Sequence, residues 1–516
     1  MEFVEKNPHM TYTQMRIAVM TLALWTGVTE AMAVEATPPR PNVILFMCDD
    51  FSYGDLSCFG QQHFGTPNID RIANEGTVFT NAYAGGAWCA PSRTSLLTGL
   101  RSDHWKNKCP NRPSYPTLGT LFQKAGYATA QFGKWHMKDS PDRNGSLISQ
   151  RGFDRVLSAF NTPGLISNHQ FHFPAEMMSD GKKIVIEKNA RAKLSKEYLW
   201  NYRKEGGQSV IYDENGNFRD LNGNTDLEYA EHIYRGEAVE FIRKHHDKPF
   251  FIYYCPAITH GPLMVKNLGR FKEIEKEDAS WTLPRKLWAA MVEETDRSMG
   301  AILSELETQG IADNTLIIFT SDNGYSAWGY GLCHGAWTDD EFLKNKGIPA
   351  DRGKFINSNG GWQVPFIARW PAKMPVSRSS QAVCFYDMMP TFAELAGVKL
   401  PWPTDGLNIT LLLTGKPEEQ PPRPSLFFPV EASFNRWREY EQDNPYDAVL
   451  LDERYYAYSI VADGESENPT IRTFDLSVDP GCTSDLAKTQ PKLAAQLTKR
   501  ALEVFRGQSR RNGSPD

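Results

Sequence analysis

A short segment of this chain places a cysteine and an arginine where a helix is expected to begin. Cys89 stands two residues before Pro91, and Arg93 follows the cysteine by one helical turn. Proline suits the first helical position and Ser92 can bond to nearby backbone N–H groups, so the pattern predicts a helix that continues through residues 94–97. The Cys89 side chain then lies near free amide N–H groups at the positive end of a helix dipole, where an anion is favoured.

Two other interpretations of this segment have to be weighed. A lone cysteine is most often a buried structural residue. A phosphatase loop would need an arginine six residues after the cysteine, but position 95 is a serine. The phosphatase interpretation therefore fails, and the structural one stays open until the rest of the chain is considered.

Four apolar runs elsewhere in the chain look like buried strands of a parallel sheet. They cover residues 42–47, 127–132, 249–254 and 315–320, and helical segments separate them. Ligands of open α/β sheets bind beyond the carboxyl ends of the strands. The polar residues found just after these runs are Asp49 and Asp50, Lys134 and His136, His260, and Asp322 and Asn323. The sequence therefore predicts one site that collects them all.

The oxygen-bearing residues of this set are suited to a hard cation. Asp49, Asp50, Asp322 and Asn323 offer only oxygen ligands, which Ca²⁺ and Mg²⁺ prefer. Zinc would draw on a close pair of His or Cys residues, and none stands beside these carboxylates. Taken singly, the acidic pair could cap a helix and the Asn-Gly step could be a turn. The histidines and the lysine could likewise be ordinary loop residues.

The pattern Cys-x-Pro-x-Arg at residues 89–93 resembles the signature of the type I, formylglycine-dependent sulfatases of the alkaline phosphatase superfamily. Further segments match that family in order along most of the chain: 49–50, 66–70, 133–136, 152–154, 288–300, 320–324, 354–366, 387–391, 405–406 and 479–480. The ordered set is far more specific than any one motif. The resemblance implies an α/β fold with a large, mostly parallel central sheet between helices. It also implies a smaller C-terminal α+β domain with a short antiparallel sheet.

The resemblance implies a function for each candidate residue. A formylglycine-generating enzyme would oxidise Cys89 to formylglycine. An oxygen of formylglycine would be one ligand of a divalent cation, usually Ca²⁺, with Mg²⁺ as the alternative. The other ligands of that cation would be Asp49, Asp50, Asp322 and Asn323. One hydroxyl of the hydrated aldehyde would attack sulfur, and the other would later expel sulfate.

The remaining residues would act around that nucleophile. Arg93 and Lys134 would hold the hydrate and neutralise charge. His260 and Lys354 would contact the sulfate ester, one of them as general acid, and His136 would abstract the hydroxyl proton in the second step.

The chain departs from the family pattern at two places. Asn359 stands where the family often has Glu, and residues 137–138 are Met-Lys where the family often has Leu-Gly. Both positions point to a changed substrate pocket or a changed support of Lys354.

Composition and the N-terminal sequence indicate the partners and the cellular location of the protein. The chain has 516 residues and a net charge of −6, which argues against a general nucleic-acid-binding role. Residues 1–33 are expected to be a signal peptide, with translation starting at Met1, Met10 or Met15, and no mature transmembrane helix is expected. Export would be to the periplasm or medium in a bacterium, or to the secretory or lysosomal route in a eukaryote. The eight scattered cysteines do not resemble a disulfide scaffold, and Cys48 and Cys255 are expected in the core.

The expected organisation is a catalytic domain at 41–415, a linker, a C-terminal domain at 424–506 and a disordered tail at 507–516. In the second domain, residues 455–461 predict a strand and 492–505 an amphipathic helix. Substrate choice is expected to depend on three further segments: 168–224, 327–352 and 434–446.

These observations predict an exported sulfatase that acts on a sulfated carbohydrate. A phosphodiesterase or phosphonate monoester hydrolase of the same superfamily is the enzymatic alternative. A catalytically silent protein that binds sulfated glycans is the alternative from another class.

Overall fold

The computed structural model describes residues 40–101, 116–137, 148–158, 172–192, 212–261, 263–274, 281–325, 353–354, 359–400, 402–423, 425–429, 447–450, 454–460, 470–479 and 482–511. Residues Pro41–Asp516 form one compact unit. The expected signal peptide and the segments 327–352 and 434–446 lie outside the described residues, as does much of 168–224.

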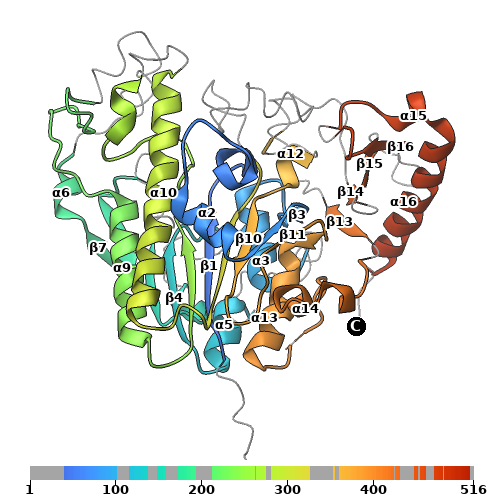
Figure 1. Ribbon diagram of the computed structural model, residues 1–516, viewed down its shortest axis with the longest axis horizontal. Coiled ribbons are helices and arrows are strands. Elements are labelled where there is room, and N and C mark those ends of the chain that lie inside the picture. The colour runs from blue at the N-terminus through green and yellow to red at the C-terminus, as the bar shows by residue number, and fades with distance from the viewer. Residues whose placement is uncertain are drawn as a thin grey trace, which may run out of the picture. The chain divides into compact units, whose positions relative to one another are not determined.

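The four predicted strands form the centre of a ten-stranded sheet, whose order is β11-β2-β10-β9-β1-β8-β4-β5-β6-β7 (Figure 1). They are β9 (Thr315–Ser321), β1 (Asn42–Cys48), β8 (Phe250–Cys255) and β4 (Ala128–Gly133). Each neighbouring pair among them is parallel, so their carboxyl ends share one edge. Every residue of the four strands is buried, which explains the continuous apolar runs and confirms Cys48 and Cys255 as core residues.

Shorter strands extend the sheet on both sides. On one side β5 (Arg155–Ser158) is parallel to β4, while β6 (Glu176–Ser179) and β7 (Lys182–Val185) are antiparallel. On the other side β10 (Phe366–Arg369) runs antiparallel to both β9 and β2 (Thr77–Phe79), and β11 (Ser377–Ser379) completes the sheet beside β2. Because β10 runs opposite to β9, it begins at the edge where β9 ends.

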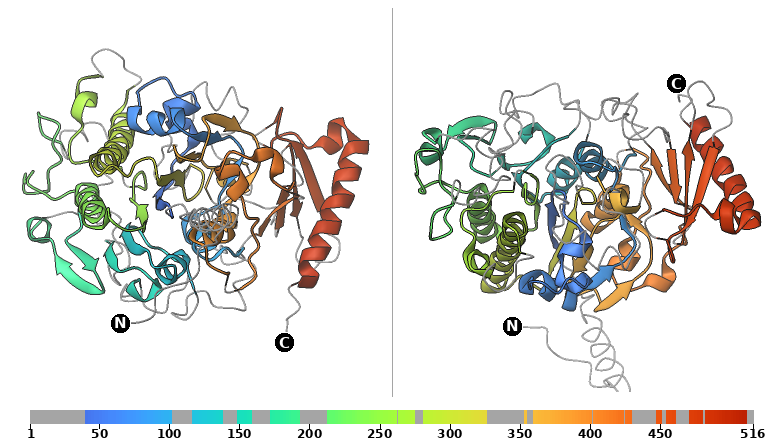
Figure 2. Two further views of the ribbon diagram at one scale, coloured as in Figure 1. Left: turned by 60° about the horizontal axis from the view of Figure 1, so that its bottom comes forward. Right: turned by 90° about the horizontal axis from the view of Figure 1, so that it is seen from above.

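Helices cover both faces of the sheet (Figure 2). Alternate residues of β1 point to opposite faces, so Ile44 and Phe46 belong to one hydrophobic cluster and Val43 and Leu45 to another. The first cluster includes residues of α2 (Pro67–Asn74), α9 (Ala230–His245) and α10 (Leu283–Thr308). The second includes residues of α3 (Cys89–Thr98), α5 (Leu118–Lys124), α13 (Met388–Ala396) and α14 (Thr410–Leu413). The sheet is therefore sandwiched by helices, as predicted.

The remaining short elements connect these layers. β3 (Ala82–Tyr83) and β12 (Val383–Cys384) form a small parallel pair. α6 (Glu187–Ala190) follows β7, and α12 (Asn359–Trp362) precedes β10.

A second sheet lies near the C-terminus and is antiparallel throughout. Its strands are β13 (Leu426–Pro429), β14 (Asp447–Leu450), β15 (Tyr455–Ile460) and β16 (Thr470–Asp475). After α15 (Leu486–Thr489), helix α16 (Pro491–Arg511) packs against this sheet through Ala494, Leu497 and Ala501. The predicted strand and helix of this region are confirmed, and α16 reaches into the segment expected to be a tail. The domain boundary near residue 415 stays a prediction, since Pro41–Asp516 form one compact unit.

None of the helices in the described ranges has the length and apolar character needed to cross a membrane.

Candidate functional site

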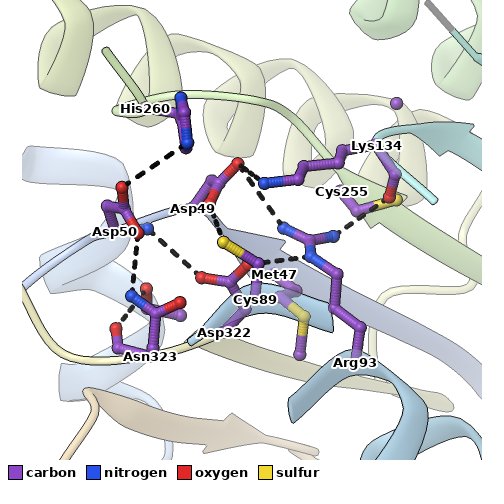
Figure 3. Close-up of polar contacts among 12 residues, drawn as sticks. Met47, Asp49, Asp50, Cys89, Arg93, Lys134, Cys255, His260, Asp322 and Asn323 are labelled. Atoms are coloured by element: carbon purple, nitrogen blue, oxygen red, sulfur yellow. Dashed lines mark hydrogen bonds and ion pairs between the residues drawn. The ribbon is translucent and has the colours of Figure 1, made fainter. Parts of the chain in front are cut away.

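The polar residues that follow the central strands meet at one edge of the sheet (Figure 3). Asp49 and Asp50 directly follow β1, and Asp322 directly follows β9. The Asp50 N–H donates to Asp322 Oδ1 over 3.2 Å, so the two loops are joined. The loop after β8 is tied to β1 in the same way, because the Asp49 N–H donates to the carbonyl oxygen of Ile258 over 2.9 Å. The backbone therefore holds the acidic residues in fixed positions.

Helix α3 brings Cys89 to this edge. The helix begins at Cys89 itself, two residues before the predicted start, and Trp88 precedes it in an extended conformation with φ of −159°. Ser92 does not cap the helix; its Oγ accepts a hydrogen bond from the Gly85 N–H over 3.2 Å. All residues of α3 are buried, so the cysteine is held by a helix that is itself part of the core.

Each carboxylate of the site is paired with one cation. The pairs are Lys134 Nζ with Asp49 Oδ2 at 2.5 Å, Lys354 Nζ with Asp50 Oδ1 at 2.6 Å, and Arg93 Nε with Asp322 Oδ2 at 2.8 Å. All six side chains are at most 4% exposed as residues. The three formal negative and three positive charges cancel, so a bound divalent cation would leave the site positive and attractive to a sulfate group.

The donor set fits a hard divalent cation. Ligand atoms of Asp49, Asp50, Cys89 and Asp322 all lie within 4.8 Å of one another. Asn323 donates its Nδ2 to Asp50 Oδ1 over 2.8 Å, while its buried Oδ1 has no hydrogen-bond partner among the described residues. A buried acceptor left in this state costs free energy, and a cation would satisfy it. The Cys89 sulfur suits such a cation poorly, whereas an oxygen at this position would suit it well.

Electrostatics support the same conclusion. Burial, followed by the neighbouring Asp49 carboxylate, raises the pKa of Asp322 to about 6. Burial also acts on Asp49, but Lys134, His260 and Arg93 together hold its pKa well below the usual range. The Asp322 carboxyl group is therefore harder to ionise than usual, and a bound cation would favour its ionised form.

His260 lies above the carboxylates, with Nε2 at 3.9 Å from Asp50 Oδ2. Its Nδ1 is 2.8 Å from the Gly261 carbonyl oxygen, which can only accept, so Nδ1 carries the proton in the neutral ring. Burial lowers the pKa of His260 to about 4. The accepting Nε2 atom is therefore the one on the side of Asp50.

His136 adopts a left-handed backbone conformation with φ of 46°, which is unusual outside glycine and is often found at functional sites. Its ring meets the Trp88 ring edge-on, with centroids 6.4 Å apart. Burial, then the charges of Lys134 and Arg93, lowers its pKa well below the usual value. A neutral imidazole can accept a proton, which is the expected chemistry of this residue.

Lys354 reaches the site from the segment before β10. Its Nζ donates to Cys89 Sγ over 3.1 Å as well as pairing with Asp50. Its backbone N–H donates to the Tyr325 carbonyl oxygen over 2.6 Å, which joins this segment to the one that follows β9.

The structure adds one residue that the sequence did not single out. Tyr253 lies inside β8, and its hydroxyl oxygen accepts a hydrogen bond from Arg93 Nη1 over 3.3 Å. A tyrosine within an apolar strand is normally a core residue. Only the position of Tyr253 near the end of its strand could have indicated that it lies close to the site.

The protein-family model of the Sulfatase family matches residues 41–398 of the chain. The chain belongs to the sulfatase family. An N-acetylgalactosamine-6-O-sulfatase of Bacteroides thetaiotaomicron is 26% identical to this sulfatase over 93% of this chain and 96% of its own. The N-acetylgalactosamine-6-sulfatase of Homo sapiens is 30% identical over 76% of this chain and 69% of its own. The protein is thus a sulfuric ester hydrolase.

A solved structure from work on the metabolism of multiple glycosaminoglycans by Bacteroides thetaiotaomicron shares the fold of this sulfatase. The TM-score is 0.64 and the sequence identity 23%, over 90% of this chain and 99% of that one.

Several motif residues of this sulfatase hold backbone segments of the fold together. The Asp296 carboxylate accepts from the N–H groups of Asn68 and Ile69 over 2.9 and 2.8 Å, which fixes the start of α2. The Asp387 carboxylate accepts from the N–H groups of Cys384 and Leu407 over 2.7 and 2.9 Å. These aspartates are therefore structural.

The structure describes Asn359 and Met137, two of the three residues at which the chain departs from the family pattern. Asn359 donates its Nδ2 to Gln363 Oε1 over 2.8 Å. Met137 is buried, and Lys138 lies outside the described residues.

Proposed function

We propose that this sulfatase hydrolyses sulfate esters of a sulfated carbohydrate, through formylglycine made from Cys89 and with one bound divalent cation, Ca²⁺ in preference to Mg²⁺. The observation that carries the proposal is the placement of Cys89. It lies in the first turn of a buried helix, among three carboxylates that have their own cationic partners. A purely structural cysteine needs no such surroundings.

The cation would be held by oxygens of Asp49, Asp50, Asp322 and Asn323 and by the oxygen that replaces the Cys89 sulfur. It would supply Lewis acidity at that oxygen. The hydrated aldehyde would supply two hydroxyl groups, one to attack sulfur and one whose deprotonation releases sulfate.

The surrounding side chains have roles that follow from where they lie. Arg93 and Lys134 would orient the nucleophile and offset its charge, since both are fixed by the carboxylates. Lys354 would bind the sulfonyl oxygens, and either it or His260 would protonate the leaving alcohol. For this role His260 would first have to take up a proton on Nε2, which the anionic substrate would favour. His136 would accept the proton of the second hydroxyl.

The substrate enters from the side where the site is open. The charged residues of the site are buried, whereas Trp88, His136 and His260 are partly exposed. The sulfate group would therefore go in first and the sugar would remain near Trp88. A tryptophan offers a broad apolar face of the kind that packs well against a sugar ring.

Maturation and location belong to the same proposal. A formylglycine-generating enzyme must act on Cys89 for this chemistry, because a thiol offers only one nucleophilic group. The apolar segment within residues 15–33 supports export.

The test begins with co-expression of the full chain and a formylglycine-generating enzyme, and mass spectrometry of the peptide that contains Cys89. Release of inorganic sulfate is then measured over a panel of sulfated saccharides with Ca²⁺ present. N-Acetylgalactosamine 6-sulfate comes first, because two relatives are named for it. Cys89→Ala is the control.

Release by the converted wild type and not by Cys89→Ala supports the proposal. If converted, Ca²⁺-loaded protein releases no sulfate from any saccharide or aryl sulfate, the proposal is wrong. Hydrolysis of matched aryl phosphate or phosphonate esters would then indicate a phosphodiesterase or phosphonate monoester hydrolase. Glycan binding without turnover would indicate a catalytically silent glycan-binding protein.

A further inference from the structure

The guanidinium group of Arg93 has an incomplete set of partners. Of its five N–H bonds, the one on Nε goes to Asp322 Oδ2, and those on Nη1 go to the Lys134 carbonyl oxygen over 3.0 Å and to Tyr253 Oη over 3.3 Å. The buried Nη2 has no hydrogen-bond partner among the described residues, and Asp49 Oδ2 lies 4.0 Å from it. The two N–H bonds of Nη2 are therefore left for a group that arrives during the reaction.

The direction of those two N–H bonds depends on what holds the other side of the guanidinium group. A planar guanidinium group that is held along only one edge can still rotate about that edge. The bond from Nε to Asp322 holds one edge of the Arg93 guanidinium group. The bonds from Nη1 to the Lys134 carbonyl oxygen and to Tyr253 hold the opposite side. Tyr253 is neither an expected metal ligand nor a predicted catalytic group, and neither is Cys255, whose thiol is a second neighbour of the Arg93 guanidinium group.

The proton of Tyr253 is directed away from Arg93. Its hydroxyl donates to Met47 Sδ over 3.3 Å, so a lone pair of the oxygen is presented to Nη1. Burial raises the pKa of Tyr253 well above its usual value, so the hydroxyl keeps this proton at neutral pH. Met47 and Tyr253 lie on adjacent strands and belong to the same hydrophobic cluster, which limits the movement of both.

We infer that Tyr253 is a positioning residue, whose hydroxyl orients the Arg93 guanidinium group so that its two unpartnered N–H bonds face the reacting oxygen at position 89. This inference rests on the proposed function, since Arg93 acts there. Tyr253 itself touches neither the nucleophile nor the substrate.

The chain provides a matched control on the same strand. Tyr254 is the next residue, is equally buried and also donates a short hydrogen bond, to Glu231 Oε1 over 2.6 Å. It belongs to the cluster on the opposite face of the sheet. Tyr254→Phe therefore removes one buried hydroxyl from the same strand without touching Arg93.

The experiment compares Tyr253→Phe with Tyr254→Phe in converted, Ca²⁺-loaded full-length protein. In Tyr253→Phe we expect kcat for sulfate release to fall about tenfold, because the guanidinium group tilts by a fraction of an ångström, with KM within about twofold of wild type. Tyr254→Phe should keep the wild-type kcat whatever its melting temperature. In an Arg93→Lys background, Tyr253→Phe should have little further effect, since the group that it positions is gone.

A kcat of Tyr253→Phe within twofold of wild type would overturn the inference. So would an equal loss in Tyr254→Phe, or an undiminished loss in the Arg93→Lys background. If Tyr253→Phe does not fold, Met47→Leu serves instead. It keeps the tyrosine but removes its proton acceptor, and we expect a smaller fall in kcat of about threefold.

Crystal structures of the two phenylalanine variants give a readout that does not depend on turnover. We expect the guanidinium group to shift in Tyr253→Phe and to stay in place in Tyr254→Phe; no shift in either would contradict the inference. Failure of the proposed function would look different, because wild-type protein would then release no sulfate while the structures still reported on Arg93.

Discussion

Glu231 gives a test of the buried architecture that does not depend on activity. It lies in α9, and its Oε1 accepts hydrogen bonds from Tyr254 Oη and Ser298 Oγ, both over 2.6 Å. Its Oε2 is buried and has no hydrogen-bond partner among the described residues. Burial raises its pKa from 4.5 to about 7, although the bonds from Ser298 and Tyr254 oppose this change.

The sign and size of the effect on stability follow from this pKa. Between pH 4.5 and 7 the folded protein keeps a proton on Glu231 that the unfolded chain releases. The unfolding free energy therefore falls as pH rises through this window, by at most about 3 kcal/mol. Glu231→Gln removes the titration and can still accept both hydrogen bonds. We expect its stability relative to wild type to be similar at pH 4 and to rise by up to that amount by pH 8.

The assay is urea unfolding of wild type and Glu231→Gln, followed by tryptophan fluorescence at pH values between 4 and 8. Glu294→Gln is a control of opposite sign. Burial acts on Glu294 too, but His232, Arg235 and Arg297 lower its pKa, so its contribution is present at neutral pH and lost below about pH 4.5. A Glu231→Gln difference that does not change with pH would refute the reasoning.

The other predictions concern the site. Asp322→Ala should abolish tight Ca²⁺ binding in calorimetry, and chelation should silence wild type until Ca²⁺ is restored. Lys354→Ala should lower kcat by about 10²–10³ in sulfate-release assays and lower the melting temperature in scanning fluorimetry, because Asp50 loses its cation. Added Ca²⁺ should recover most of that melting temperature but not the rate. Trp88→Ala should raise KM for a sulfated saccharide about tenfold and leave inhibition by inorganic sulfate unchanged, whereas equal effects on both would contradict a sugar contact.

The sequence predicts the centre of the fold well because the central strands are buried on both faces. Such strands read as unbroken apolar runs, and parallel neighbours place their carboxyl ends together, so the meeting of Asp49 with Asp322 could be foreseen. The start of α3 was predicted two residues late, because Pro91 tolerates the third helical position as well as the first.

What could not be predicted are contacts whose residue type has an ordinary explanation. Tyr253 lies in an apolar strand, and nothing in its sequence neighbours reveals that its hydroxyl contacts Arg93 of α3, a helix that packs on the same face of the sheet. Ser92 resembles a cap but bonds to Gly85 instead, because the chain before α3 folds back upon it. Such pairings depend on tertiary contacts, which local sequence patterns do not encode.

The hydrogen bond between Lys354 and Tyr325 has a consequence for engineering. It joins described residues on either side of 326–352, Tyr325 and Lys354, at the edge of the sheet that carries the site. Where two ends of the chain are already joined, the free energy of closing the chain between them depends only weakly on its length. Replacing the stretch between Tyr325 and Gly353 with that of another sulfatase therefore tests whether residues 327–352 determine substrate preference, as the sequence predicts.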